Sequence, residues 1–488
     1  MGSDKKFKRK IILKSMKKKV EKYNKGAITA LVLAFAFVFL ILISSILGFV
    51  SLQLRYSSKL KAWNDALYIA EAGINYYQWC LNNEVEDSCS LSKNFYDAEG
   101  KLIGTFSLEV IPTTKCGQTI QTRIVSTGRS QKYPEIQRKV SVLYARKSVA
   151  KYAYLLNDNV WAGADRIIRG PYHSNGGIRM DGQNRSTVTS SAPGGEWVCT
   201  ASFGCALCPT SHGCRVESGK CICPGVFTTT GNSNPDLFEF PIPSFDFEGI
   251  TVDLAQMKNL AGIYLPPSTD IDVHGKGYHI KLKENGTFEV WIITRLSSSW
   301  AYSLEEGWHW DRFIIANEYL YNTYSIDFSC PVVFVEDNLW IEGKVKNKIT
   351  IASADLINPN EDTSIVLPGN IEYTTQDGSD GLALIAEKNI LISPVSPNDM
   401  KLSGIFIAQK GRFGRNLYWG NIKNSLEITG SIISNGRVGT KWSSGSIIVS
   451  GYLTRRNYID SKLIYSPPPF VPYVEHNFKI LDWQELEE

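Results

Sequence analysis

The longest apolar segment of the chain lies close to its N-terminus. Residues Ala27 to Leu54 contain no Asp, Glu, Lys or Arg. As an α-helix, these residues would be roughly 42 Å long, against a hydrocarbon core of roughly 30 Å in a bilayer. The pattern therefore predicts one helix that spans a membrane.

A second apolar pattern follows the span directly. Apolar side chains recur there at spacings of three and four residues, at Leu60, Trp63, Leu67, Ala70, Ile74 and Tyr77. This period is typical of an amphipathic helix with one buried face. We expect the membrane helix to continue as a stalk to about Cys80, with this stripe buried on a globular domain.

The pattern changes to strands after the stalk. Residues 105–111, 119–126 and 135–145 alternate between apolar and polar side chains, and turn-rich segments separate them. Alternation of this kind predicts a half-buried antiparallel sheet. Helix and sheet together predict a small two-layer body over residues 55–148.

The remaining chain is predicted to be rich in β-strands. Residues 149–247 are turn-rich and contain a Cys-rich insert at 199–223, and strand patterns resume over 248–488. Residues 278–282 and 287–293 flank an Asn-Gly pair, which predicts a hairpin. Seven Trp and Tyr residues lie between 300 and 324. Exposed rings could stack on sugars, but we favour the interpretation that they fill a core.

Four segments of the last region resemble one another. Residues 333–341, 384–392, 406–413 and 432–438 each contain a short apolar run, a polar turn and a second apolar run. The last three are offset by about 22 and 26 residues, which favours a β-helix (solenoid), with a β-sandwich as the alternative. Ser174-Asn175-Gly176 and Ser434-Asn435-Gly436 are candidates for equivalent turns. The predicted fold class is α+β, mostly β.

Charge predicts how the chain crosses the membrane. Residues 1–26 carry eleven Lys and Arg residues against two acidic residues, whereas the whole chain has a net charge of +4. The positive-inside rule therefore predicts a single-pass protein of the cytoplasmic membrane, with its N-terminus in the cytoplasm and the rest outside. The apolar segment is too long for a cleaved signal peptide. No later Lys/Arg stripe indicates nucleic-acid binding.

All ten cysteines follow the predicted span. They are Cys80, Cys89, Cys116, Cys199, Cys205, Cys208, Cys214, Cys221, Cys223 and Cys330. An even number of cysteines on the outer side favours disulfides. A zinc site built from Cys205, Cys208, Cys214 and either His212 or a later Cys is the alternative. A second C-x2-C half-site is missing, so we predict no metal, and the pairing of the cysteines stays open.

The N-terminal region resembles type IV prepilins and pseudopilins. A basic leader ends at Gly26, and Ala27 begins a continuous apolar helix. The resemblance implies that a prepilin peptidase cuts between Gly26 and Ala27. Major pilins carry Glu at the fifth mature position, where this chain has Leu31, as minor pilins at a filament tip do. Residues 66–74, ALYIAEAGI, resemble the A-x-x-A-E-A-G helix of PilX-type minor pilins.

The resemblance implies a function and partners. The chain would be a minor, tip-associated subunit of a type IV pilus or a related pseudopilus, and it would act in assembly, display or adhesion. Its partners would be other pilin subunits, the inner-membrane assembly machinery and the peptidase. Helix packing is assigned to Leu31, Ala34, Ala70, Glu71, Ala72 and Gly73. An extracytoplasmic surface or glycan ligand stays unidentified.

No catalytic motif is present. Asp355, Glu361 and Asp362, and likewise Asp377 and Asp380, lie in polar loops without a calcium-loop pattern. His173, His274, His279 and His309 have no sequence partner. We therefore expect neither catalysis nor a cofactor. The alternative function is a membrane-anchored protein that binds or degrades glycans and never enters a filament.

Overall fold

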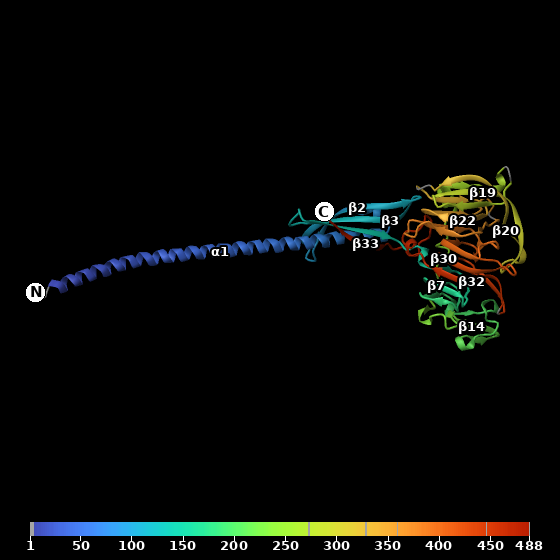
Figure 1. Cartoon of the computed structure of the whole chain (residues 1–488), viewed down its shortest axis with the longest axis horizontal. Coiled ribbons are helices and arrows are strands. Elements are labelled where there is room, and N and C mark those ends of the chain that lie inside the picture. The colour runs from blue at the N-terminus through green and yellow to red at the C-terminus, as the bar shows by residue number, and fades with distance from the viewer. Residues whose placement is uncertain (1–3, 272–273, 327–328, 359, 446, 488) are drawn as a thin grey trace.

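The structure is a computed structural model that describes residues 4–271, 274–326, 329–358, 360–445 and 447–487, without the side chains of 4–8, 17–26 and 86. A single helix, α1 (Asp4–Asn82), runs through the leader, the apolar segment and the stalk. Figure 1 shows α1 as a long rod that ends beside a small sheet, with a large strand-rich body beyond it. The fold is thus a long N-terminal helix with a mostly β remainder.

The small sheet has five antiparallel strands in the order β1-β2-β3-β4-β33. They are β1 (Ser92–Tyr96), β2 (Leu102–Lys115), β3 (Gln118–Ser130), β4 (Gln137–Ala145) and β33 (Lys479–Leu486). The three predicted strands are confirmed as β2, β3 and β4. Strand β33 corrects the expected boundary, because the C-terminal strand belongs to this sheet and not to the β-rich region 248–488.

Helix and sheet enclose a small core. Its helical side is formed by Ile69, Ala70, Ile74 and Tyr77, which pack against Phe106, Ile124, Val140 and Val142. The predicted stripe is wrong at its first two positions, since Leu60 and Trp63 are 50% and 47% exposed. The sheet covers the helix only from Ala62 onward, and the Arg138 guanidinium lies 4.8 Å from the Trp63 ring.

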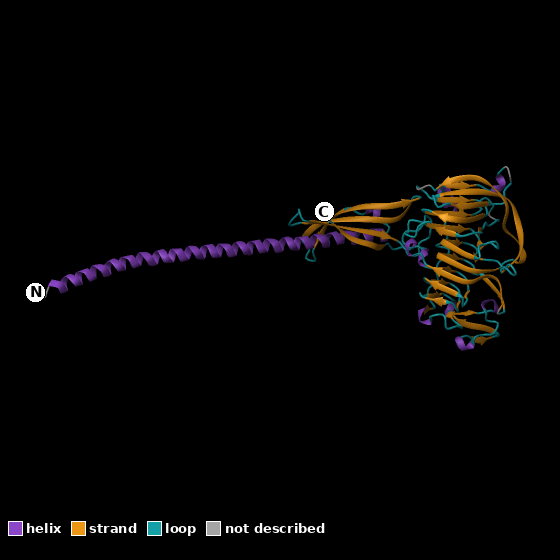
Figure 2. Ribbon diagram, viewed as in Figure 1, coloured by secondary structure: helices purple, strands orange, loops and turns teal. Residues whose placement is uncertain are grey.

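The large body contains ladders of parallel strands, which Figure 2 shows stacked one above another along the length of the body. In the first ladder, each strand pairs in parallel with the next. Its members are β17 (Ile263–Leu265), β21 (Val332–Val335), β23 (Lys348–Ser353), β26 (Gly381–Ala386), β28 (Asp399–Ala408), β30 (Ile422–Ser434), β5 (Tyr154–Leu156), β8 (Tyr172–Ser174), β11 (Val188–Ser190) and β16 (Phe238–Glu239).

Two further sets of parallel pairs flank this ladder. One set contains β18 (Tyr278–Leu282), β22 (Leu339–Val345), β24 (Ile365–Leu367), β27 (Ile390–Ile392) and β29 (Phe413–Gly414). Three more strands pair in parallel in a separate sheet, namely β6 (Val160–Ala162), β9 (Ile178–Met180) and β15 (Val226–Phe227). The other set is a series of parallel pairs. It runs from β25 (Ile371–Tyr373) through the N-terminal parts of β28 and β30 to β32 (Ile447–Tyr458), β7 (Arg166–Arg169) and β10 (Gln183–Asn184).

The predicted register of the repeats is confirmed. Ala386 lies opposite Ala408, and Ala408 lies opposite Ser434. Ser434 lies opposite Leu156, which in turn lies opposite Ser174. The two Ser-Asn-Gly turns therefore follow strands of the same ladder, two steps apart.

The order of the ladder differs from the order of the sequence. Strand β5, the first in the large body, pairs with β30, which lies near the end of the chain. The expected separation of 149–247 from 248–488 is therefore wrong, because one ladder and one buried core run through both regions. The chain enters and leaves the body at neighbouring points, where Ser148 N–H donates to the Ile464 carbonyl and Val149 N–H to the Pro472 carbonyl.

The Cys-rich insert forms a small sheet of its own. Strands β12 (Glu196–Val198), β13 (Arg215–Glu217) and β14 (Lys220–Pro224) are antiparallel. Trp197, Phe203 and Phe227 share its core with cysteine side chains. The other elements are β31 (Lys441–Ser444), α2 (Leu254–Leu260) and 3₁₀ turns at 86–88, 149–151, 193–195, 201–203, 210–212, 235–237, 268–270 and 461–463.

A long hairpin arm lies on the outer side of the large body. The predicted Asn-Gly hairpin is confirmed, because β18 pairs with β19 (Thr287–Ser303). Strand β19 then pairs with β20 (Gly307–Ser325), and Figure 1 shows β20 curving along the side of the body away from α1. The expectation of a buried aromatic core is wrong here, since Trp300, Trp308 and Trp310 are 47%, 46% and 64% exposed.

Candidate functional site

Helix α1 has an exposed half and a packed half. Residues 27–61, apart from half-buried Ser58, are exposed, and this part of α1 is long and apolar enough to cross a membrane. Leu31 and Ala34 lie on this exposed half. Ala27 is exposed too, and the predicted cleavage position after Gly26 lies within α1.

Small residues bring the packed half of α1 close to the sheet. Ala66, Ala70 and Gly73 are buried on one face of the helix. A Cβ atom at Gly73 would lie 2.4 Å from Ser126 Oγ, and one at Gly128 would lie 2.1 Å from the Ala66 carbonyl oxygen. Of the other assigned packing residues, Glu71 and Ala72 are half-buried. Gly128 and Ser126, the partners of this helix face, were not expected from the sequence.

Polar contacts fix the end of the helix on the sheet. The Tyr144 hydroxyl donates to the Ile74 carbonyl over 3.0 Å, and burial raises the pKa of Tyr144, so the hydroxyl stays a neutral donor. The Phe478 N–H donates to Asn82 Oδ1 over 2.7 Å. These bonds tie α1 both to the middle of the sheet and to the returning C-terminal segment.

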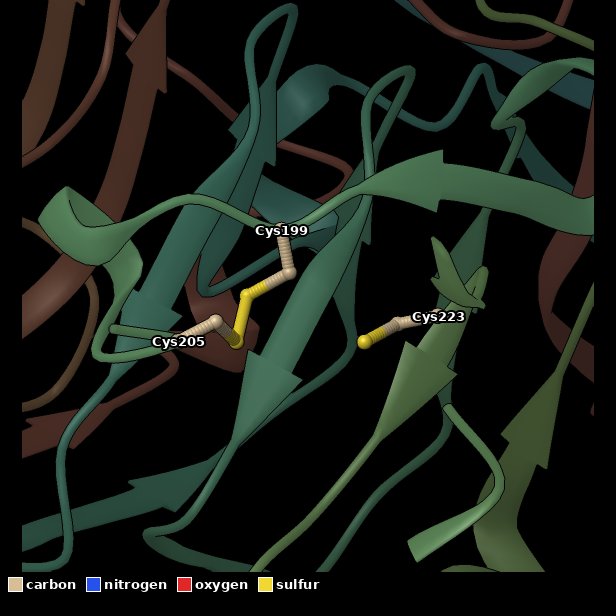
Figure 3. A group of neighbouring side chains, drawn as sticks. All are labelled: Cys199, Cys205 and Cys223. Carbon is tan, nitrogen blue, oxygen red and sulfur yellow. A yellow bond between two sulfur atoms is a disulfide. The ribbon is translucent and has the colours of Figure 1, made fainter. Parts of the chain in front are cut away.

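Five disulfides join the ten cysteines. They are Cys80–Cys89, Cys116–Cys330, Cys199–Cys205, Cys208–Cys221 and Cys214–Cys223. Figure 3 shows the Cys199–Cys205 bond with Cys223 nearby. The zinc alternative is wrong, because Cys205, Cys208 and Cys214 are each bonded to another sulfur and offer no thiolate. Cys116–Cys330 joins the tip of the β2–β3 hairpin to the large body.

His173 and Asp380, two of the residues considered above as candidates, make local structural contacts. His173 contacts Thr189 Oγ1 at 2.9 Å and Asn175 Oδ1 at 3.1 Å. Asp380 is buried and accepts hydrogen bonds from the backbone N–H groups of Asn347 and Thr375. These contacts are those of structural residues that hold turns.

A buried charged group was missed by the sequence reasoning. His279 Nδ1 lies 2.8 Å from Glu318 Oε2, and His279 Nε2 lies 3.4 Å from Glu342 Oε1. Burial opposes the charged imidazolium, but both carboxylates favour it, and the pKa of His279 is raised. These residues come from β18, β20 and β22, so only the pairing of the strands reveals the group.

A second charged group joins strands β31 and β32 to the turn that precedes β7. Asp165 accepts hydrogen bonds from Arg455 Nε at 2.7 Å and from Lys441 Nζ at 2.7 Å. Burial opposes ionisation, but these cations lower the pKa of Asp165 to about 2. Arg455 lies opposite buried Arg166 where β32 pairs with β7, so this carboxylate offsets a cluster of cations.

No protein-family model matches the chain, and no curated protein sequence matches it. Among solved structures, the competence-associated pilin ComZ from Thermus thermophilus is 12% identical, and the alignment covers 87% of this chain and 97% of that chain. The TM-score is 0.31. This similarity is too low to establish a shared fold.

Proposed function

We propose that this chain is a minor, PilX-like pilin, a membrane-stored subunit that joins a type IV pilus or a related pseudopilus. The observation that carries the proposal is the division of α1. Its apolar half, Ala27 to Leu54, is exposed, while its second half is packed on an antiparallel sheet. An exposed apolar rod needs either lipid or other apolar helices around it.

Lateral packing of apolar helices is the mechanism of assembly in this proposal. The exposed half carries small residues at Ala30, Ala34, Ala36, Ser44, Ser45 and Gly48. Small residues let helices approach closely where lipid gives no hydrophobic drive for association. The subunit leaves the bilayer when its helix exchanges lipid for the helices of neighbouring subunits.

The leader sets the orientation in this proposal. Its eleven basic residues hold the N-terminus in the cytoplasm, and the large body lies outside. A prepilin peptidase cuts after Gly26, and the inner-membrane assembly machinery then extracts the helix. Disulfides in the body are consistent with an oxidising compartment.

A position near the filament tip is part of the proposal. Leu31 offers no carboxylate to the N-terminal amine of a neighbouring subunit. The body is also far larger than the small sheet that packs on α1, and it projects beyond the end of the helix (Figure 1). Both features suit a subunit that caps or initiates a filament, where the body is free to assist assembly or adhesion.

We infer that the large body is a β-solenoid. Parallel pairing continues through ten strands of the first ladder, and equivalent turns follow successive strands. A β-sandwich consists of antiparallel sheets, so this pairing supports the solenoid. We also propose that the chain binds and assembles without catalysis, because the buried carboxylates of Asp380 and Asp165 are engaged in structural hydrogen bonds.

Intact mass of the membrane-extracted protein tests the proposed function. We expect a mature chain that begins at Ala27, with a methylated amine, and its recovery in sheared filaments. Gly26→Leu is expected to block removal of the leader and recovery in filaments. Gly48→Leu, on the same helix, is expected to leave removal of the leader intact. A working protein that retains residues 1–26 would exclude the pilin and support the membrane-anchored alternative.

A further inference from the structure

We propose that the outer face of the β19–β20 arm is a binding site for neutral glycans. Trp300 lies opposite Trp310, and Tyr302 lies opposite Trp308, so their side chains share one face of the hairpin. The three tryptophans are between 46% and 64% exposed. We call these four residues and the adjacent Trp442 the aromatic row.

The rings of the aromatic row form a continuous series of contacts. The ring centroids are 5.1 Å apart for Trp310 and Trp300, and 5.8 Å apart for Trp300 and Trp308, whose planes differ by 10°. Tyr302 continues the series, at 5.5 Å from Trp308 and 5.7 Å from Trp442. Because each ring contacts the next, the row keeps its shape without a ligand.

The edge of β19 and the opposite face of the arm fix the row on the large body. The N–H of Tyr302 donates to the Leu417 carbonyl, and the N–H of Leu417 donates to the Tyr302 carbonyl, at 3.0 and 2.9 Å. Buried Asp311 accepts hydrogen bonds from Asn416 Nδ2 and the Tyr418 hydroxyl, both at 2.8 Å. A site held in this way loses little conformational entropy on binding.

The chemistry of the row favours sugars. An aromatic face carries negative charge density and attracts the weakly positive C–H bonds on the flat face of a pyranose. The indole N–H groups of Trp300, Trp308 and Trp310 donate no hydrogen bond within the described part of the chain, so they are available to sugar hydroxyls. In contrast, the indole N–H of Trp442 donates to the Arg415 carbonyl at 2.8 Å and serves only to hold its ring.

Charge argues against a nucleic acid, which could also stack on such rings. Residues 299–312 contain Glu305, Glu306 and Asp311 against Arg312, and neither β19 nor β20 contains a lysine. Glu305 is paired with Arg412, whose Nε lies 2.7 Å from the carboxylate, so that cation is not free for a phosphate. The row therefore offers a phosphate backbone little positive charge, and nucleic-acid sites depend on Lys and Arg. A neutral polysaccharide has no such penalty. The arm also lies on the side of the body away from the membrane helix (Figure 1), where a polymer has access.

Binding to defined oligosaccharides tests the site. The full-length chain is purified in an amine-oxide detergent, since detergents with sugar head groups would compete. Calorimetry with cellohexaose and chitohexaose is expected to show binding to at least one. Trp310→Ala should weaken it by about fivefold, which corresponds to about 1 kcal/mol for one aromatic stacking contact. Trp310→Tyr should retain most of the affinity.

Two controls keep the test decisive. Trp483→Ala removes a tryptophan of similar exposure, 46%, from the small sheet and should leave binding unchanged. The melting temperature of each variant shows whether the arm is still folded, and Trp310, at the end of the row, is chosen to disturb it least. The proposal would be overturned if neither sugar bound, or if Trp483→Ala lost as much affinity for the sugars as Trp310→Ala. Preferential binding of single-stranded DNA, or burial of the row in a dimer, would also overturn it.

This proposal rests on the proposed function only for the display of the body outside the cell. Sugar binding is measured on purified protein, so it can fail while leader removal at Gly26 is confirmed, and the reverse also holds.

Discussion

The side-chain amide of Asn157 donates a hydrogen bond to Asn435 Oδ1, with an N–O distance of 2.8 Å across 278 residues of chain. Asn157 Oδ1 in turn accepts from Asn175 Nδ2 at 2.7 Å. The three asparagines follow Ser434, Leu156 and Ser174, which are successive partners in the first ladder. A short ladder of amides therefore joins the end of the β-rich body to its beginning.

Replacement of Asn157 is expected to weaken this junction. Asn157→Ala removes both amide hydrogen bonds, and because the site is exposed, the free energy of unfolding should fall by only about 1 kcal/mol. Chemical denaturation measures the loss. Asn317→Ala, at an exposed position on the hairpin arm, is the matched control and should have a smaller effect. Equal stability of the Asn157 variant and the wild type would show that the amide ladder contributes nothing.

Replacement of Asp165 is expected to lower the free energy of unfolding by more, because its partner Arg455 and the neighbouring Arg166 are buried. Asp165→Asn leaves Arg455, Arg166 and Lys441 close together without a counter-charge, which should lower the free energy of unfolding by about 3 kcal/mol. The exposed Glu284→Gln is the control. Chemical denaturation at neutral pH measures both variants. An equally small decrease in the free energy of unfolding for Asp165→Asn and Glu284→Gln would contradict this account.

The pH dependence of the same site has a defined sign. The pKa of Asp165 is lowered to about 2 in the folded protein, below the ordinary value of 3.8. Its stabilisation is therefore present above about pH 4 and is lost as the pH falls toward about 2. The difference in stability between wild type and Asp165→Asn should shrink over that range. A difference that stays constant would exclude the charged contact as its source.

His279 should show the opposite sign. Its pKa is raised above 6.5 because Glu318 and Glu342 favour the imidazolium, although burial opposes it. The stabilisation is thus complete below about pH 6.5 and declines as the pH rises through the raised pKa. We expect His279→Gln to destabilise the protein more at about pH 5.5 than at about pH 9, as thermal unfolding can measure. A larger loss at the higher pH would show that His279 acts as a neutral residue.

The close contact between helix and sheet gives another prediction. Gly128→Val places a side chain where the Ala66 carbonyl oxygen and the Ala70 nitrogen lie 2.1 and 2.5 Å from the new Cβ. Helix and sheet must separate, and stability should fall by about 3 kcal/mol. Gly231→Val is the control, since a Cβ atom there meets nothing within 4 Å. Protease resistance of the stalk near Ala66 reports the separation directly.

The disulfide Cys116–Cys330 should govern how firmly the two bodies are joined. The pair spans 214 residues, and its replacement by serines should reduce stability by about 3 kcal/mol. We also expect faster proteolysis at 146–149 and 472–478, where the chain crosses between the bodies. The matched pair Cys208→Ser and Cys221→Ser, inside the Cys-rich insert, should not change cleavage at those crossings.

Sequence patterns predicted the small body well because its elements are half-buried. Alternation along β2, β3 and β4 and the period of three and four along the stalk each report one apolar face. Strand β33 escaped the same test, since most of its residues are exposed and it shows no alternation. Leu60 and Trp63 continue the helical period beyond the end of the sheet, so the pattern alone placed the buried stripe too early.

The register of the repeats was predictable, but the closure of the ladder was not. Ala386, Ala408 and Ser434 follow similar strand-turn-strand segments, so their spacing revealed their equivalence. The next partner, Leu156, is far away in sequence and lies in a turn-rich region without a visible repeat.

The aromatic row shows a different limit of sequence patterns. Along β19, Trp300 and Tyr302 alternate with Ala301 and Ser303, and alternation does not say which set faces the body. The small side chains are buried, because they allow the arm to lie close to the strands beneath it. The large rings therefore face solvent, contrary to the expectation that aromatic side chains fill the core.

The pairing of β4 with β33 has a consequence for synthesis on the ribosome. Residues Lys479–Leu486 supply the strand that covers the edge of β4, although the rest of that sheet lies more than three hundred residues earlier in the sequence. Until residues 479–486 have been synthesised, β4 presents unpaired backbone groups to any strand nearby. A chain truncated before Lys479 would expose this edge, so β4 gains its second partner only after the large body has been synthesised.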